Sequence, residues 1–388
     1  METWTVTLKD WQASPEEYQI VDIRDKLAFA YGHMPGAVNF PLEELRSDPG
    51  LLPQGKTPLL CCKSGALSGQ LAQELREAGY PVCDLPEGYY GWLRQKLTQE
   101  ENRAAEVEKS IRKKFHRQLW SKFAKAIQTY ELVQPGDKIA VCISGGKDSM
   151  LMAKLFQELK LHNKFPFEVE YLVMDPGYSP ANREIIERNA RMLSVPIHVF
   201  ETDIFDSVYH VEKSPCYLCA RMRRGYLYKE AQRMGCNKIA LGHHFDDVIE
   251  TNLMGMLFGG QVQTMMPKLH STNHPGMELI RPMYLIREED IKRWRDYNDL
   301  HFLQCACKFT ETCSVRGTGD NASKRLETKE LIRALKEKNP QVEYNIFHAL
   351  ENVNLSTVLA YKDADGVHSF LDTYDAPRGG EAEEPQGQ

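Results

Sequence analysis

The stretch VCISGGKDSM, residues 141–150, decides the fold that we expect for this chain. Apolar residues lead into Gly145 and Gly146, and an apolar run resumes at Met150. A strand that ends on two glycines and continues as a helix usually presents backbone N–H groups to an anion. The Walker pattern, GxxxxGK followed by Ser or Thr, does not fit these residues. The stretch therefore predicts an anion site of another kind at the N-terminus of a helix.

The composition is that of an ordinary globular protein. The chain has 388 residues, of which 42% are hydrophobic and 26% charged, and this length suggests two or three domains. A net charge of −6 gives no global sign of nucleic-acid binding, so such a sign must be local. The apolar stretches stay well short of the ~20 residues that span a bilayer, so we expect no membrane contact. Ten cysteines without a visible secretory signal predict thiol or metal chemistry in a reducing cytoplasm.

Two α/β segments make up most of the chain. Short apolar runs that alternate with helix-like stretches predict a parallel sheet in each segment, doubly wound in the larger one. The strand-like runs lie at residues 19–23, 58–61, 81–85, 139–143, 169–174, 197–200 and 238–241. We therefore expect an α/β domain over 1–98, a linker or the first turns of a helix over 99–108, a larger α/β domain over 109–373 and a disordered tail over 374–388.

A basic segment opens the larger domain. An apolar residue recurs every four positions and predicts one helix with one buried stripe, formed by Ile111, Phe115, Leu119, Phe123 and Ile127. Residues 109–125 contain no acidic residue. The positions outside the apolar stripe carry seven cations: Lys109, Arg112, Lys113, Lys114, Arg117, Lys122 and Lys125. Three further arginines lie close together at Arg221, Arg223 and Arg224. Basic surfaces bind nucleic-acid phosphates, whereas a solvated helix face is the alternative interpretation.

A second polar motif follows the apolar run at 238–241. Gly242 and His243 precede Asp246 and Asp247, which open a helix-like segment. In a doubly wound sheet the carboxyl ends of the strands face the ligand crevice. Adjacent carboxylates at that place suit Mg²⁺, and they also suit the N-terminus of a helix. Both roles can coexist, and the spacing does not tell which aspartate would reach a metal ion.

Strand, Ser-Gly-Gly-x-Asp-Ser and helix together resemble the PP-loop pyrophosphatase family, which cleaves ATP to AMP and pyrophosphate. A plain Gly-Gly turn is the alternative. The implied ATP-binding residues are Ser144, Gly145, Gly146, Asp148, Ser149, Asp175, Gly242 and His243, whereas Lys147 stands at the variable position of the motif. The resemblance makes Asp148 and Asp247 the candidate catalytic carboxylates. Mg²⁺ is the expected metal ion, with Asp246 and Asp247 as its candidate ligands.

The cysteines point to sulfur or metal chemistry. Cys216 and Cys219 form a CxxC directly before the arginine cluster, and Cys305, Cys307 and Cys313 follow about ninety residues later. One CxxC leaves zinc, an iron–sulfur cluster and a redox pair open. The remaining cysteines of this domain, Cys142 and Cys236, lie within or near apolar runs and are predicted to be core residues.

The motifs GGKDS, CYLCARMRRGYL, LGHHFDD, FGG and IRPM together resemble the tRNA 2-thiocytidine synthetase family over roughly residues 105–353. In that family three cysteines hold a 4Fe-4S cluster, and one iron stays open to carry sulfur. The resemblance implies Cys216, Cys219 and Cys305 as the cluster ligands. Cys307 competes for the third place, because the family's second CxxC is shortened to CxC here. Residues 308–325 also depart from the family's usual sequence.

The first domain resembles a rhodanese domain over about residues 5–97. The resemblance rests on DIR at 22–24, GHMPGA at 32–37, CKSGALS at 62–68 and LPEGYYGW at 85–92. Such domains carry a persulfide on a cysteine whose loop amides stabilise a thiolate, which implies Cys62 as the catalytic cysteine. Leu67 stands where the family usually has arginine, so a cationic contribution to anion binding is missing. A rhodanese fold kept only as a docking module is the alternative.

Taken together, the resemblances imply an ATP-dependent tRNA sulfurtransferase. It would adenylate a pyrimidine carbonyl, with cytidine C2 of the anticodon loop favoured, and replace the oxygen with sulfur by way of the cluster. The implied partners are tRNA and a cysteine desulfurase or other sulfur donor, and a homodimer is one option for the oligomeric state. The alternatives are a related PP-loop enzyme that thiolates or desulfurates another base, a tRNA lysidine synthetase, and a non-catalytic sulfur-carrier protein.

Overall fold

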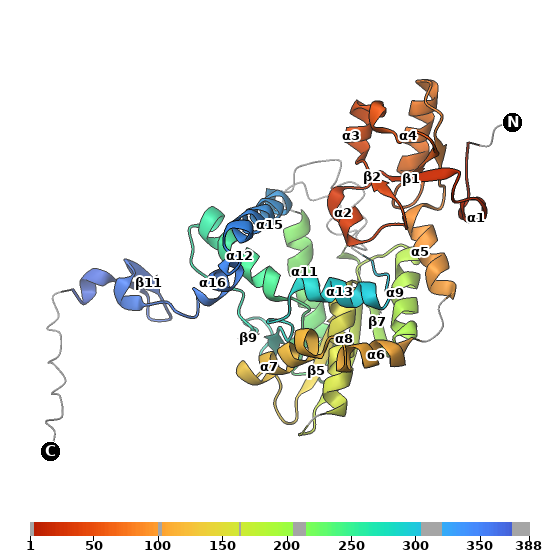
Figure 1. Cartoon of the computed structure of the whole chain (residues 1–388). Helices are drawn as coiled ribbons and strands as arrows, with labels where there is room; N and C mark the ends of the chain where they lie inside the picture. The colour runs from red at the N-terminus through yellow and green to blue at the C-terminus, as the bar shows by residue number, and fades with distance from the viewer. Residues whose placement is uncertain (1–3, 100–102, 163, 205–214, 304–319, 375–388) are drawn as a thin grey trace, which may run out of the picture. The chain divides into compact units, whose positions relative to one another are not determined.

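The computed structural model describes residues 4–99, 103–162, 164–204, 215–303 and 320–374 (Figure 1). The chain packs as two compact units. The first comprises Met1–Val248 with Met265–Lys324, and the second comprises Ile249–Thr264 with Arg325–Gln388. Both predicted α/β domains have their sheets in the first unit. The predicted disordered tail lies, from residue 375 on, outside the described residues.

The N-terminal domain is built on a four-stranded parallel sheet. The strand order is β2 (Val38–Asn39), β1 (Tyr18–Asp22), β3 (Thr57–Cys61) and β4 (Cys83–Asp84). The helices are α1 (Leu8–Ala13), α2 (Lys26–Tyr31), α3 (Leu42–Ser47), α4 (Ala66–Glu77) and α5 (Gly88–Gln99), with the short 3-10 helix η1 (Pro49–Leu51). Leu59 and Leu60 of β3 are fully buried on opposite faces, because successive side chains of a strand alternate. The three strands predicted from apolar runs are confirmed.

The larger domain has a six-stranded sheet in the order β7-β6-β5-β8-β10-β9. The strands are β5 (Lys138–Ile143), β6 (Glu168–Asp175), β7 (Ile197–Glu201), β8 (Lys238–Ala240), β9 (Lys268–His270) and β10 (Glu278–Ile280). All pairs are parallel except β9 with β10, so the doubly wound parallel fold is confirmed with one antiparallel edge strand. From β5 the chain first builds outward to β6 and β7 and then returns to add β8 on the other side. The crevice at this reversal of strand order is where such sheets bind ligands.

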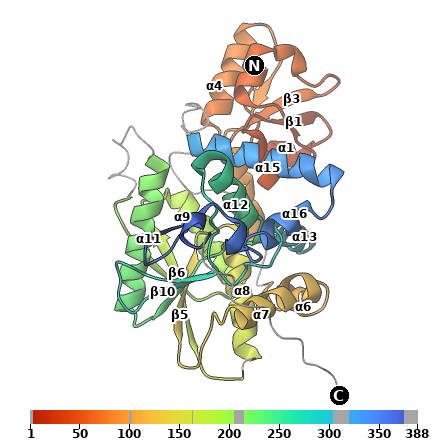
Figure 2. The same cartoon turned by 90° about the vertical axis from the view of Figure 1, so that its left-hand side faces the viewer.

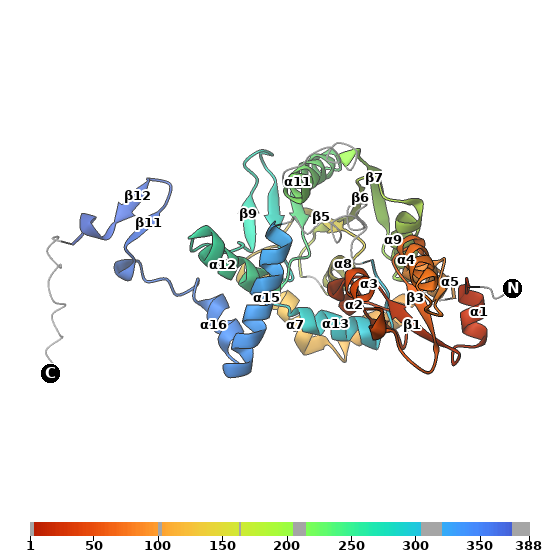
Figure 3. The ribbon, with the colours of Figure 1, turned by 90° about the horizontal axis from the view of Figure 1, so that it is seen from above.

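Helices cover both faces of this sheet. The main ones are α8 (Lys147–Leu161), α9 (Pro180–Met192), α11 (Pro215–Arg233) and α13 (Glu288–Tyr297), and α12 (Phe245–Gly259) begins directly after the loop that follows β8. On β5, Val141 packs in the same apolar cluster as α8, whereas Ala140 packs with Tyr228 of α11. Figure 3 accordingly shows α8 and α11 on opposite sides of β5. Burial of the sheet on both faces explains why its strands read as continuous apolar runs.

The predicted single helix over 109–127 is instead interrupted. It consists of α6 (Ala104–Arg112), a π-helical turn η2 (His116–Trp120) and α7 (Ser121–Thr129), beside α8 in Figure 2. All five residues of the predicted stripe are buried. A strict spacing of four drifts around an α-helix of about 3.6 residues per turn, and a wider π turn brings the stripe back to one side. The helix also begins at Ala104, inside the stretch 99–108 that the sequence left as linker or helix.

Apolar and polar contacts join the two domains of the first unit. One continuous cluster of buried residues includes Leu93 of α5 and Ile185 of α9. The guanidinium of Arg94 lies 2.6 Å from the carboxylate of Glu184. The ring of Trp92 meets that of His301 edge-on, with 5.2 Å between centroids.

The second unit contains the remaining elements. They are α15 (Asp320–Lys338, with its first residues in the first unit), α16 (Val342–His348), η3 (Leu355–Thr357), β11 (Ala360–Lys362), β12 (Val367–Ser369) and η4 (Phe370–Asp372), together with most of α12. The buried carboxylate of Glu250 lies 3.1 Å from Arg325 and 3.4 Å from Lys329. Across the described residues, none of the helices combines the length and the apolar character that a membrane crossing needs.

Candidate functional sites

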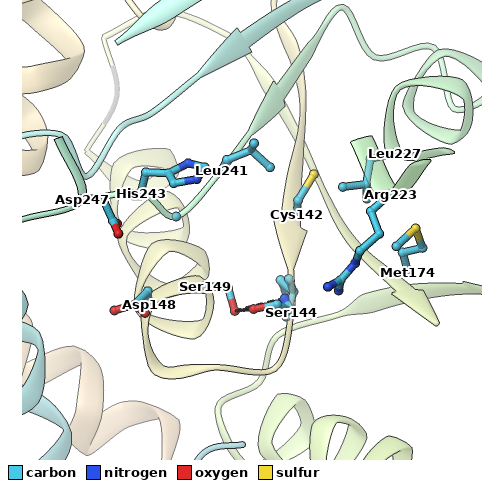
Figure 4. Close-up of a pocket in the computed structure, with 12 residues that line it drawn as sticks. Cys142, Ser144, Asp148, Ser149, Met174, Arg223, Leu227, Leu241, His243 and Asp247 are labelled. Atoms are coloured by element: carbon cyan, nitrogen blue, oxygen red, sulfur yellow. Dashed lines mark hydrogen bonds between the residues drawn. The ribbon is translucent and has the colours of Figure 1, made fainter. Parts of the chain in front are cut away.

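A pocket of about 370 Å³ opens where β5 and β8 end, at the reversal of strand order (Figure 4). Six residues that the sequence predicted for ATP or metal binding line it: Ser144, Asp148, Ser149, Gly242, His243 and Asp247. Two loops supply them, one after each strand, although about a hundred positions separate these loops in the sequence. The fold thus brings the predicted residues to one place.

The first loop is shaped by a glycine that no other residue could replace without strain. Gly145 has φ +84°, and a Cβ there would lie 2.5 Å from Cγ1 of Ile186. The loop also gathers two hydroxyl groups, because the Oγ atoms of Ser144 and Ser149 are 3.2 Å apart and Ser149 donates to the carbonyl of Gly146. α8 begins directly afterwards, so its amino-terminal dipole favours an anion at this loop. Gly145 and Gly146 therefore shape the loop rather than line the pocket.

Lys147, which the motif left as a variable position, is a buried cation. Its side chain is 3% exposed, and Nζ lies 3.0 Å from the carboxylate of Asp148 and 3.2 Å from that of Glu288. Burial disfavours the charged form, but the carboxylates of Asp148 and Glu288 outweigh it and raise the pKa of Lys147 above its ordinary value. The ammonium thus stays charged beside the predicted catalytic carboxylate. A single sequence gave no signal for this role, since the pairing depends on α13.

The structure separates the two adjacent aspartates. The carboxylate of Asp246 accepts hydrogen bonds from the guanidinium of Arg287 at 3.1 Å and from the backbone N–H of Glu288 at 2.7 Å, so it fastens the start of α13. Asp247 lines the pocket instead, and its carboxylate accepts the N–H of His244 at 3.0 Å. Of the two metal-ligand candidates, Asp247 is the one placed at the pocket.

Asp175 is not brought to the pocket lining. Its carboxylate accepts the backbone N–H groups of Gly177 at 2.9 Å and Tyr178 at 2.6 Å, and it lies 3.4 Å from the guanidinium of Arg183. Asp175 therefore stabilises the turn that follows β6. Its assignment to nucleotide binding stays a prediction without a contact to support it.

One wall of the pocket is apolar. It is formed by Cys142, Met174, Leu227 and Leu241, and Figure 4 shows the guanidinium of Arg223 beside it. Burial raises the pKa of the Cys142 thiol to about 12, so this cysteine is a neutral wall residue. Arg223 was predicted for nucleic-acid binding with Arg221 and Arg224. Only Arg223 lines the pocket, and it donates to Oη of Tyr178 at 3.3 Å, whereas Arg221 and Arg224 are exposed.

The N-terminal domain holds Cys62 at the start of a comparable loop. Sγ of Cys62 accepts the backbone N–H of Gly65 at 3.1 Å and the hydroxyl of Ser68 at 3.4 Å. Gly65 has φ +89°, and a Cβ there would lie 1.9 Å from the carbonyl oxygen of Pro86. The neighbouring Cys61 is fully buried, and burial raises the pKa of its thiol well above the ordinary value. The loop geometry therefore singles out Cys62, while Leu67 contributes no charge.

The basic segment presents most of its predicted cations to solvent. Lys109, Lys113 and Arg117 are exposed. Lys125 is exposed as well. Three others have partners in the protein: Arg112 lies 2.7 Å from the carboxylate of Glu158, Nζ of Lys114 lies 3.8 Å from the ring centroid of Tyr297, and Nζ of Lys122 lies 3.6 Å from the carboxylate of Asp290. Of the cluster candidates, Cys216 and Cys219 lie in the first five residues of α11, with side chains outside the described part. Cys305, Cys307 and Cys313 lie outside the described residues. Cys142 and Cys236 are buried, as predicted.

Two regions of the chain match known protein families. Residues 113–307 match the model of the PP-loop domain, and residues 6–95 match that of the rhodanese-like domain. A tRNA-cytidine(32) 2-sulfurtransferase of Geotalea uraniireducens is 37% identical over 237 residues, which cover 60% of this chain and 90% of the relative. The chain belongs to the tRNA-cytidine(32) 2-sulfurtransferase family. A member from Paraburkholderia xenovorans is 31% identical over 272 residues, covering 69% of this chain and 77% of its own.

The Geotalea relative has no room for a rhodanese-like domain. Because 237 residues are 90% of the Geotalea relative, about 26 of its residues stay unmatched, too few for a segment as long as 6–95. Among solved structures, the U34-tRNA thiolase NcsA from Methanococcus maripaludis with its [4Fe-4S] cluster is 20% identical, with TM-score 0.47, and the match covers 60% of this chain and 79% of that one. The human single-domain sulfurtransferase TSTD1 is 25% identical, with TM-score 0.22, and the match covers 24% of this chain and 96% of that protein.

Proposed function

We propose that this chain is an ATP-dependent tRNA sulfurtransferase that replaces the C2 oxygen of a cytidine with sulfur. The observation that carries the proposal is the pocket at the ends of β5 and β8. There, two serine hydroxyls, two carboxylates and an apolar wall meet at the amino end of α8. The family relatives are named for this reaction on cytidine 32 of tRNA.

The pocket suits ATP in a defined orientation. The hydroxyls of Ser144 and Ser149 and the amino end of α8 would bind the phosphates, since glycine at 145 lets the backbone approach closely. The apolar wall around Met174 and Leu227 would take the adenine ring. Mg²⁺ prefers oxygen ligands and bridges phosphates, so the carboxylates of Asp148 and Asp247 are the donors that fit it.

The chemistry needs ATP because a carbonyl oxygen is a poor leaving group. The C2 oxygen of the base would attack the α-phosphorus, and pyrophosphate would leave. Sulfide sulfur would then attack C2, and AMP would leave with the former carbonyl oxygen. Lys147, held charged between two carboxylates, would maintain the loop geometry for the first step through its ion pair with Asp148, which lines the pocket.

Sulfur would reach the base by way of a Cys62 persulfide. A thiol reductant would release its outer sulfur as sulfide, so that Cys62 returns to the thiol and the reductant becomes a disulfide. The N–H of Gly65 and the hydroxyl of Ser68 already point at Sγ, and the same donors would stabilise a thiolate or a persulfide anion there. A cysteine desulfurase is the expected donor. Since the Leu67 position lacks a cation, thiosulfate is a weaker candidate than a protein persulfide.

A 4Fe-4S cluster held by Cys216, Cys219 and Cys305 completes the proposal, supported by the family resemblance and by the thiolate preference of such clusters. When bound, the cluster would supply an iron that can carry sulfur. Anaerobic preparations of the Cys305→Ala and Cys307→Ala variants distinguish the third ligand, because only the true ligand should cost the iron–sulfur absorbance. Stoichiometric zinc without iron in the wild-type protein would contradict the cluster.

The tRNA would bind the exposed part of the basic segment. Lys109, Lys113 and Arg117 present unshielded cations on one stretch of α6 and the π turn, and such contacts weaken as salt rises. The function is tested with purified protein, ATP, a sulfur donor and a tRNA transcript with cytidine at position 32. The expected products are 2-thiocytidine and AMP, and the same transcript with uridine at position 32 serves as the control. AMP release with no thiolated cytidine under anaerobic conditions would overturn the proposal.

A further inference from the structure

A tyrosine of the rhodanese-like domain reaches the ATP loop of the PP-loop domain. Tyr31 is the last residue of α2, and its phenolic oxygen accepts the backbone N–H of Lys147 at 3.0 Å. The same hydroxyl donates to the carbonyl of Leu303 at 2.9 Å. The backbone carbonyl of Tyr31 in turn accepts a hydrogen bond from the guanidinium of Arg295. Tyr31 therefore contacts three segments of the PP-loop domain.

The contact with Lys147 replaces a helix cap. The first N–H groups of a helix have no partner within the helix, and a side-chain oxygen normally accepts one of them. α8 starts at Lys147, and its N-cap residue, Gly146, has no side chain to do this. The phenol of Tyr31 supplies the missing acceptor from another domain. A Cβ at Gly146 would lie 3.2 Å from this oxygen, so glycine also leaves room for the approach.

Tyr31 is held there as a neutral hydrogen-bonding group. Its ring lies between two cations, with Nζ of Lys147 at 5.2 Å and the guanidinium of Arg295 at 6.0 Å from the ring centroid. Removal from water raises the pKa of Tyr31, so the phenol keeps the proton that it donates to Leu303. The contacts are thus directional and not merely apolar packing.

We propose that Tyr31 is a positioning residue that couples the rhodanese-like domain to the ATP loop. Docking of α2 would fix the amino end of α8, and a nucleotide held by that end would favour the docked domain in return, because such coupling is reciprocal. The Geotalea relative has no room for the domain, so the coupling would be a property of chains that carry both parts. The inference rests on the proposed binding of ATP at this pocket.

The first test measures binding of α,β-methylene-ATP to the full chain and two variants. Tyr31→Phe removes the hydroxyl and keeps the ring, and Tyr18→Phe removes the same atom from β1 of the same domain as a matched control. A hydrogen bond is worth about 1 kcal/mol, so we expect the Kd of Tyr31→Phe to rise about fivefold and that of Tyr18→Phe to stay unchanged. A folded Tyr31→Phe protein with the wild-type Kd would overturn the coupling.

The second test measures hydrogen exchange and separates this inference from the proposed function. Saturating α,β-methylene-ATP should slow hydrogen exchange of backbone amides in α2 of the wild-type chain, although α2 does not line the pocket. Tyr31→Phe should lose this protection while keeping protection in α8. A wild-type chain that binds the nucleotide without protecting α2 would overturn the coupling alone. A wild-type chain that does not bind the nucleotide would overturn the proposed function.

Discussion

The loop after β5 and the loop after β3 use the same backbone design for different chemistry. Each follows a buried parallel strand, turns on a glycine with positive φ, at Gly145 and Gly65, and leads into a helix. Each therefore presents N–H groups to a negative charge. The first gathers hydroxyls and carboxylates around a pocket of about 370 Å³, whereas the second closes around one sulfur atom. The difference shows that side chains, and not the turn itself, select a polyphosphate or a thiolate.

The largest effect is expected at the carboxylate of the first loop. Asp148→Ala should lower the rate of AMP formation with every sulfur donor by a factor on the order of 100 or more. The reason is that it removes a carboxylate next to the reacting phosphates. Because Asp148 also pairs with the buried ammonium of Lys147, the melting temperature should fall in this variant, whereas Cys62 alkylation should stay unchanged. Pyrophosphate release at the wild-type rate in this variant would contradict the assignment of ATP cleavage to this pocket.

Cys62→Ser should lower thiolation with one sulfur source and not with the other. Thiolation driven by a cysteine desulfurase should fall to background, because the variant lacks the sulfur atom that Gly65 and Ser68 contact. Thiolation driven by free sulfide should stay within about twofold of wild type, since sulfide bypasses the loop. Equal loss with both donors would mean that the N-terminal domain acts only as a scaffold.

Substitution by alanine should lower the melting temperature by different amounts at the glycines of the two loops. Gly65→Ala places a Cβ against the Pro86 backbone, which cannot move aside, whereas Gly145→Ala meets only the side chain of Ile186. Gly136 also has φ +84° but has open space, so Gly136→Ala measures conformational strain alone, about 1–2 kcal/mol. The expected order of melting-temperature loss is Gly65, then Gly145, then Gly136. Equal losses at all three would mean that φ strain alone matters.

Much of this fold follows from the sequence because buried parallel strands are continuous apolar runs. The four strands β5 to β8 were predicted within one residue at every end. β9 and β10 were missed, since Lys268–His270 and Glu278–Ile280 are only three residues long and give no clear apolar run. The π turn was missed because a four-residue spacing also fits an α-helix over a few turns. These misses concern elements whose conformation depends on neighbours distant in the sequence.

The candidate site likewise contains residues that the sequence predicts and residues that it does not. Ser144, Asp148 and Ser149 could be predicted, because the motif and its local context suffice. Tyr31 and Lys147 could not, since their contact spans 116 positions and leaves no local pattern. Adjacent Asp246 and Asp247 differ only in which way the first turn of α12 points them. The sequence therefore predicts the loops and not the contacts that hold them.

The smallest effect concerns a cysteine inside the nucleotide pocket. Because burial favours the neutral thiol and raises the pKa of Cys142 to about 12, its alkylation rate should rise about tenfold per pH unit from pH 8 to 10, without a plateau. α,β-Methylene-ATP should slow the reaction, since Cys142 lines the pocket. Mass spectrometry of the Cys142 peptide measures the alkylation rate. A plateau of this rate below pH 9 would show that Cys142 is a reactive thiol and not a neutral wall residue.

The central claim is that the first loop uses ATP to activate a base that receives sulfur from the second. Its most direct test is one reaction containing the wild-type chain, ATP, tRNA, a cysteine desulfurase, ³⁴S-labelled cysteine and a stoichiometric thiol reductant, followed by nucleoside mass spectrometry and AMP measurement. We predict ³⁴S in 2-thiocytidine, one AMP for each thiolated cytidine, and no label with Cys62→Ser. Label in another nucleoside, or thiolation without AMP, would contradict the account.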